Sequence, residues 1–120
     1  MNPFKMFSEA AYVATKRKDS REHRLGAVGV RKDGTKVYAS NGTVIGPGTG
    51  RCGKAHAEAR LANKLDVGST VFIARVGGKH SDGNWLLAKP CPGCEMILRN
   101  NGIKRCYYTI SNSEYGVMEL

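Results

Sequence analysis

The chain has 120 residues and a formal net charge of +9, from 19 Lys and Arg against 10 Asp and Glu. This length predicts one domain over residues 1–120. The absence of a long apolar run or an apolar leader excludes a membrane span and a signal peptide, so we expect a cytoplasmic protein. The positive charge suits an anionic partner such as a nucleotide or nucleic acid, although it serves solubility equally well.

The first part of the chain predicts a helix followed by two strands. Apolar side chains recur at three- and four-residue steps over residues 4–18, which indicates an amphipathic helix. Strands are expected at residues 24–31 and at about 36–45. Asp33 and Gly34 form a dipeptide typical of a hairpin turn, so we expect these two strands to pair in antiparallel fashion.

The middle of the chain predicts a helix and a buried strand. A glycine-rich loop over residues 46–53 lacks the Gly-Lys-Ser/Thr register of a phosphate-binding loop. It leads to a second expected helix over roughly 54–65. The β-branched run at residues 70–76 predicts a central strand, and residues 77–85 predict a polar loop.

The last part predicts a third helix and a β-hairpin. The helix is expected over about 92–100, with Gly102 as its stop. Strands are expected at residues 104–110 and near 115–120, and their short connection favours an antiparallel pair. The element order is therefore α-β-β-α-β-α-β-β, which indicates an α/β fold.

Three side chains have the donor atoms of a catalytic zinc site. Such a site uses three His, Cys or carboxylate ligands and leaves the fourth position open. His56, Cys91 and Cys94 supply one imidazole and two thiols. The cysteine pair falls at the start of the helix expected over 92–100, where free N–H groups and the helix dipole favour thiolate. The pattern thus predicts bound zinc.

A carboxylate lies next to this set of donors. Glu58 is two residues from His56, and such side chains diverge by about 200° on a helix with roughly 3.6 residues per turn. Glu58 can therefore stay off the metal and carry a proton between an activated water and a leaving group. These groups suit hydrolytic displacement of an amine from an electron-poor ring.

Two other interpretations of the cysteines stay open. A structural zinc site needs a fourth protein ligand, for which Cys52 is the obvious candidate. A redox pair needs only Cys91 and Cys94, although it has no use for a His-x-Glu motif upstream. Cys106 falls within an expected strand, where we expect it to be buried.

The joint motif carries a family resemblance. His56-Ala57-Glu58 followed by Pro90-Cys91-Pro92-Gly93-Cys94 resembles the signature of the zinc-dependent cytidine/deoxycytidylate deaminase superfamily. The resemblance spans roughly residues 24–110 and includes the order of elements. It implies a three-layer fold, in which helices cover both faces of a mixed five-stranded sheet. The expected antiparallel C-terminal hairpin is similar to the arrangement in nucleoside deaminases.

The resemblance also implies roles for single residues. His56, Cys91 and Cys94 would bind zinc and Glu58 would move the proton. Asn41, Ala57 and Pro90 would contact the sugar or the base. The implied reaction is hydrolysis of cytosine in a free nucleoside or nucleotide to uracil and ammonia, by a protein that forms a homo-oligomer.

A second functional hypothesis is a deaminase that acts on cytosine or adenine in single-stranded DNA or RNA. The basic charge supports it, as do aromatic side chains that can stack on bases. Trp85, in the expected loop before the cysteines, is the best stacking candidate, followed by Tyr107, Tyr108 and Tyr115. A third hypothesis, a zinc-binding module without activity, leaves Glu58 without a purpose.

Overall fold

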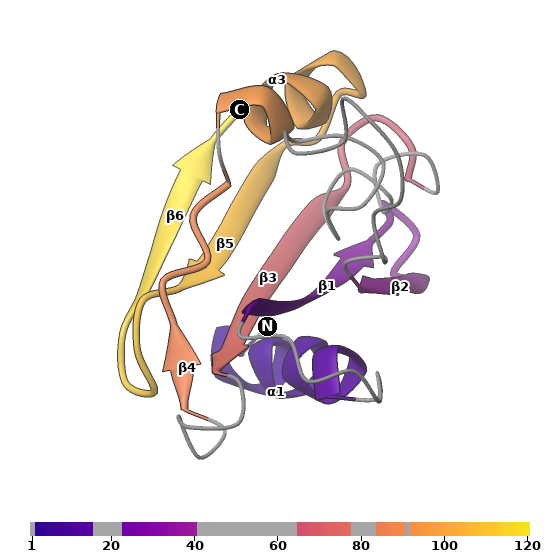
Figure 1. The fold of residues 1–120 in the computed structure, drawn as a ribbon. Helices are drawn as coiled ribbons and strands as arrows, with labels where there is room; N and C mark the ends of the chain where they lie inside the picture. Colours follow the sequence, from indigo (N-terminus) through magenta and orange to yellow (C-terminus); the bar gives the residue numbers. More distant parts are fainter. Residues whose placement is uncertain (1, 16–22, 41–64, 78–83, 91) are drawn as a thin grey trace, which may run out of the picture.

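The computed structural model describes residues 2–15, 23–40, 65–77, 84–90 and 92–120 (Figure 1). Within these residues lie two helices and six strands. The helices are α1 (Pro3–Thr15) and α3 (Pro92–Asn100). The strands are β1 (His23–Val30), β2 (Lys36–Ser40), β3 (Thr70–Gly77), β4 (Trp85–Leu86), β5 (Arg105–Thr109) and β6 (Tyr115–Glu119).

The strands form one mixed sheet in the order β2-β1-β3-β5-β6, with β4 paired to the end of β3. The β3–β5 pair is parallel, and every other pair is antiparallel. The five strands of the main path are those expected from the sequence. The two-residue strand β4 was not expected, because the segment before Trp85 is polar and so short a strand has no periodicity of its own.

The predicted turns and helix ends are confirmed at several points. Gly34 has a φ of 91°, which glycine adopts without steric cost, and its N–H donates to the Arg31 carbonyl in the β1–β2 turn. α1 begins one residue before the predicted start, because Asn2 caps it by accepting a hydrogen bond from the Phe4 N–H at 3.0 Å. The helix expected over 54–65 lies outside the described residues, apart from Leu65.

Helices cover both faces of the sheet, as Figure 1 shows for α1 and α3. Successive side chains of a strand point to opposite faces. In β3, Phe72 and Val76 therefore pack under α1, and Val71 and Ile73 pack under α3. The result is the predicted three-layer arrangement, with one apolar cluster on each side of the sheet.

A glycine lets α1 approach the sheet closely. An ideal Cβ on Gly26 of β1 would lie 1.8 Å from the carbonyl oxygen of Ala10. Ala10 and Ala14 of α1 are both fully buried, which is consistent with a helix backbone lying almost on the strand. The small side chains of α1 are therefore matched by the missing side chain at Gly26.

Aromatic side chains fill the α1 side of the core. Phe7 is fully buried and makes edge-on contacts with Phe72 and Trp85, at ring-centroid distances of 6.0 and 6.1 Å. Tyr107 stacks on Phe72 at 4.7 Å, and Tyr115 contacts Phe7 at 5.8 Å. These rings, including Trp85, thus hold α1 on the sheet.

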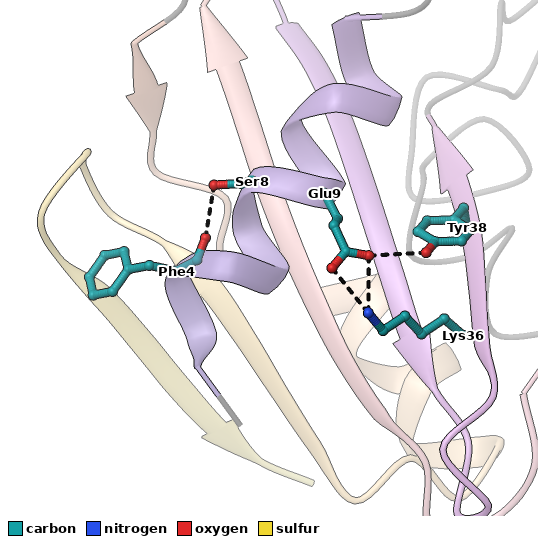
Figure 2. A network of polar contacts seen from close by, with 5 residues as sticks. All are labelled: Phe4, Ser8, Glu9, Lys36 and Tyr38. Carbon is teal, nitrogen blue, oxygen red and sulfur yellow. Dashed lines mark hydrogen bonds and ion pairs between the residues drawn. The ribbon is translucent and has the colours of Figure 1, made fainter.

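An ion-paired cluster joins α1 to the edge strand β2 (Figure 2). The Nζ of Lys36 lies 3.1 Å from Glu9 Oε2, and the Tyr38 hydroxyl donates to Glu9 Oε1 at 3.0 Å. Desolvation by itself raises the pKa of Glu9, but the hydrogen bonds from Lys36 and Tyr38 outweigh it. The pKa of Glu9 therefore lies below its ordinary value of 4.5.

Neither described helix is long and apolar enough to span a membrane.

We expect Gly26→Ala to lower the free energy of unfolding by about 1–3 kcal/mol, because the added methyl group meets a helix backbone that cannot yield without shifting α1. Urea unfolding followed by circular dichroism measures this change. Gly34→Asn is the control, since nothing lies within 4 Å of its Cβ position and Asn tolerates a positive φ better than most residues. A Gly26→Ala protein as stable as wild type would contradict the close packing of α1 on β1.

We expect the contribution of Glu9 to stability to depend on pH. Its lowered pKa means that the contribution is complete above pH 4.5, the ordinary value, and is lost as the pH falls through the folded-state value. Glu9→Gln should cost about 0.2–1 kcal/mol at neutral pH. The difference from wild type should shrink in acid.

Unfolding measured at several pH values tests this expectation. Glu114→Gln is the matched control, because no partner of the Glu114 carboxylate is found among the described residues. A Glu9→Gln effect that stays constant down to the lowest pH would show that the cluster contributes no linked protonation.

Candidate metal centre

Cys94 lies in the first turn of α3 and is completely buried. Leu98, one helical turn later, is also buried and packs against the sheet. Residues four apart share a helix face, so Cys94 lies on the side of α3 that faces the sheet. The exposed Pro92 occupies the first helical position, as predicted, where its missing N–H costs nothing.

The end of α3 is fixed by a turn that only glycine accommodates easily. Gly102 has a φ of 74°, and its N–H donates to the Arg99 carbonyl at 3.0 Å. The Ile103 N–H donates to the Leu98 carbonyl at 3.1 Å, which completes a Schellman motif. Ile103 and Leu98 are both buried in the same cluster, so the motif holds the helix on the sheet.

The segment before α3 is attached to the end of β5. The Ala88 N–H donates to the Thr109 carbonyl at 2.9 Å, and the Thr109 hydroxyl donates to the Leu86 carbonyl at 2.7 Å. Ala88 and Pro90 are buried, and Leu87 and Lys89 between them are exposed. This alternation places Pro90, the predicted substrate-contacting residue, in the interior directly before the start of α3.

Sequence reasoning missed the residues that hold this segment. Thr109 is a fully buried hydroxyl in β5, and the Arg75 N–H also donates to it, at 3.3 Å. Asn112 accepts a hydrogen bond from the Trp85 N–H at 2.6 Å. The only sequence signal for Thr109 was its position as a polar residue at the end of an apolar strand. That signal does not identify the residues to which its hydroxyl is bonded.

The other predicted site residues lie outside the described part of the chain. These are Asn41, His56, Ala57, Glu58 and Cys91. Within residues 2–15, 23–40, 65–77, 84–90 and 92–120 there is no cluster of three or more potential metal ligands. The structure therefore positions Cys94 and Pro90, and whether they meet the imidazole and carboxylate stays a prediction.

The structure describes one of the two cysteines that lie outside the motif. Cys106 is fully buried in β5 and packs with Val71 and Ile73, as expected for a core thiol. Neither Cys94 nor Cys106 is part of a disulfide. Cys52, the candidate fourth ligand of a structural site, lies outside the described residues.

The sequence matches no family model and no curated protein. Solved structures do match. The crystal structure of cytidine deaminase from Burkholderia pseudomallei is similar over 99% of this chain and 93% of its own, with a TM-score of 0.68 and 20% identity.

Two mycobacterial structures agree with this result. Cytidine deaminase from Mycobacterium leprae covers 98% of this chain and 93% of its own, with a TM-score of 0.63 and 15% identity. The enzyme from Mycobacterium tuberculosis covers 91% of this chain and 85% of its own, with a TM-score of 0.60 and 18% identity. At these identities the likeness establishes architecture, and the chain has the cytidine-deaminase-like fold.

Proposed function

We propose that the protein is a zinc-dependent hydrolase that deaminates cytosine in a free nucleoside or nucleotide. One observation carries the proposal: a fold like that of cytidine deaminases extends over nearly the whole chain, and Cys94 of the Pro-Cys-x-x-Cys motif is buried in the first turn of the crossover helix. The motif predicts zinc-dependent deamination and the fold is like that of cytidine deaminases, so both support the proposal.

The described donor fits zinc. A buried thiol without a disulfide in the first turn of a helix is a soft ligand that the helix N-terminus helps to keep as thiolate. Its burial on the sheet side of α3 restricts access of solvent from the outer side of the helix. His56 and Cys91 would complete the ligand set, and three protein ligands leave one position open.

The other residues of the proposed site have separate roles in the reaction. Zinc, when bound, supplies a Lewis acid that activates water at neutral pH. Glu58 takes a proton from the attacking water and delivers it to the amine that leaves C4 of cytosine as ammonia. Asn41 and the backbone at Ala57 and Pro90 orient the ring and the sugar. Cytosine and water are thereby converted to uracil and ammonia.

The arrangement of the sheet favours the hypothesis of a small substrate over that of a polynucleotide substrate. β5 and β6 pair in antiparallel fashion, the hairpin that resembles the nucleoside-deaminase arrangement. Trp85 and Tyr107, candidates for stacking on bases, are instead packed against Phe7 and Phe72. The net charge of +9 is the observation that favours the second candidate, a deaminase of single-stranded nucleic acid.

We expect zinc-loaded protein to release ammonia from one of cytidine, deoxycytidine or their phosphates. Glu58→Ala should lower turnover by roughly 10²- to 10⁴-fold, the usual contribution of general acid–base catalysis, and should still bind zinc. Ammonia release over a substrate panel, with zinc measured by elemental analysis, tests both expectations. If no free nucleoside or nucleotide is deaminated, the small-molecule proposal is wrong. If only single-stranded nucleic acid is deaminated, the second candidate is the function.

Substitution of single cysteines tests zinc binding separately from activity. We expect Cys94→Ala to lose zinc and Cys106→Ala to keep it, because both thiols are buried and only Cys94 belongs to the motif. Elemental analysis of the folded variants measures the metal content. Equal zinc in the two variants would remove Cys94 from the ligand set, whatever the activity of the protein.

A further inference from the structure

Thr109 lies at the end of β5, where three strands of the sheet meet. The parallel pairing of β3 with β5 extends to Ile73 and Tyr108, the residue before Thr109. Further along β3, Arg75 pairs with Leu86 of β4. Figure 1 shows the chain from β4 to α3 running beside β5. Thr109 is thus next to the segment that leads to the start of α3.

The Thr109 hydroxyl connects two residues that are opposite each other in β3 and β4. It accepts a hydrogen bond from the Arg75 N–H at 3.3 Å and donates one to the Leu86 carbonyl at 2.7 Å. The hydroxyl therefore joins the N–H of one strand to the carbonyl of the other. Because Thr109 is fully buried, water cannot readily replace its hydroxyl when that group is removed.

A further hydrogen bond of Thr109 fixes the chain closer to α3. The Ala88 N–H donates to the Thr109 carbonyl at 2.9 Å, and Ala88 is buried in the cluster under α3. Pro90 is two residues further along the chain and is also buried. Two extended residues span at most about 7 Å, so Pro90 lies close to the point of attachment.

The chain between Ala88 and Pro90 has little freedom to absorb a shift. The ring of Pro90 fixes its own φ and also restricts the backbone of Lys89 before it. A displacement of Ala88 is therefore passed on to Pro90. The helix that follows is held separately, by Leu98 in the core and by the turn at Gly102. Loss of the Thr109 hydroxyl should thus move Pro90 more than it moves α3.

We propose that Thr109 is a positioning residue for the substrate, because its hydroxyl fixes the segment that brings the Pro90 backbone to the cytosine ring. This inference rests on the proposed function, in which Pro90 orients the ring. Thr109 acts through the backbone of Leu86 and Ala88 and does not touch the substrate. Since α3 has its own attachments, the proposed zinc ligand Cys94 stays in place when the hydroxyl is lost.

Thr109→Val tests this role, since it keeps the branched shape of the side chain and removes the hydroxyl. We expect the KM for the nucleoside or nucleotide that wild type deaminates to rise about tenfold, while kcat stays within about twofold. The reason is that a contact made equally in the ground state and the transition state affects binding alone. Zinc content by elemental analysis should equal that of wild type. Hydrogen exchange of the Ala88 N–H, measured by NMR, should become faster relative to that of the β3 amides.

Two variants separate the hydroxyl from stability. Thr109→Ser keeps the hydroxyl and loses the buried methyl group, so it should be less stable than wild type and keep the wild-type KM. Val30→Ala makes a cavity elsewhere, because Val30 is buried under α1 and lies opposite Thr70, at the other end of β3 from Arg75. It should also lose stability and keep the wild-type KM.

A folded Thr109→Val protein with the wild-type KM would overturn the proposal, and so would a Thr109→Ser protein with the KM of Thr109→Val. Loss of zinc from Thr109→Val would also overturn it, because Thr109 would then support the metal site and not the ring. Wild type that deaminates no free nucleoside or nucleotide contradicts the proposed function itself. An unchanged KM in an active enzyme contradicts only the role of Thr109.

Asn112→Ala decides the question if circular dichroism shows that Thr109→Val does not fold. The exposed Asn112 accepts a hydrogen bond from the Trp85 N–H at 2.6 Å, at the start of the same segment. Its truncation loosens this segment without disturbing the core. A raised KM in Asn112→Ala with unchanged zinc content supports the proposal, and a wild-type KM overturns it.

Discussion

β3 and β5 pair in parallel at the centre of the sheet, and this pairing governs the rest of the arrangement. Parallel neighbours cannot be joined by a hairpin, so the chain must cross over one face of the sheet before it returns. α3 makes that crossing. Its C-terminal turn is bonded to the turn just before β3, because the Gly68 N–H donates to the Gly102 carbonyl at 2.8 Å. Because both ends of the crossover are fixed, the thiol in its first turn has a defined place in the interior.

The two faces of the sheet differ in what packs on them. On the α1 face, alanines, Gly26 and a cluster of aromatic rings produce close packing. On the α3 face, Cys94 in the first turn of α3 and Pro90 before the helix are both buried. Segment 84–88 joins the two regions, since Trp85 packs under α1 and Ala88 under α3. Stability of one face therefore supports the geometry of the other.

Charge is distributed unevenly over this frame. The chain is strongly basic, yet the β5–β6 hairpin has Arg105 as its only cation among Arg105–Glu119, and that side chain is paired with Glu119. At the opposite edge, Lys36 is paired with Glu9 and joins β2 to α1. Each edge strand of the described sheet therefore has a side-chain ion pair, which joins β2 to α1 at one edge and β6 to β5 at the other.

Sequence alone determined the elements whose signals are local. The order of elements was predicted from hydrophobic periodicity, the Asp33-Gly34 turn, and the proline and glycine at the ends of α3. The chemistry was predicted from the spacing of His56, Glu58, Cys91 and Cys94. All of these signals lie in residues that are close together in the sequence. Contacts between distant segments were not accessible in this way. The β4 strand, the buried hydroxyl of Thr109, the match between Gly26 and Ala10 and the packing of Trp85 on Phe7 needed the tertiary structure, because each joins residues that only the folded sheet brings together.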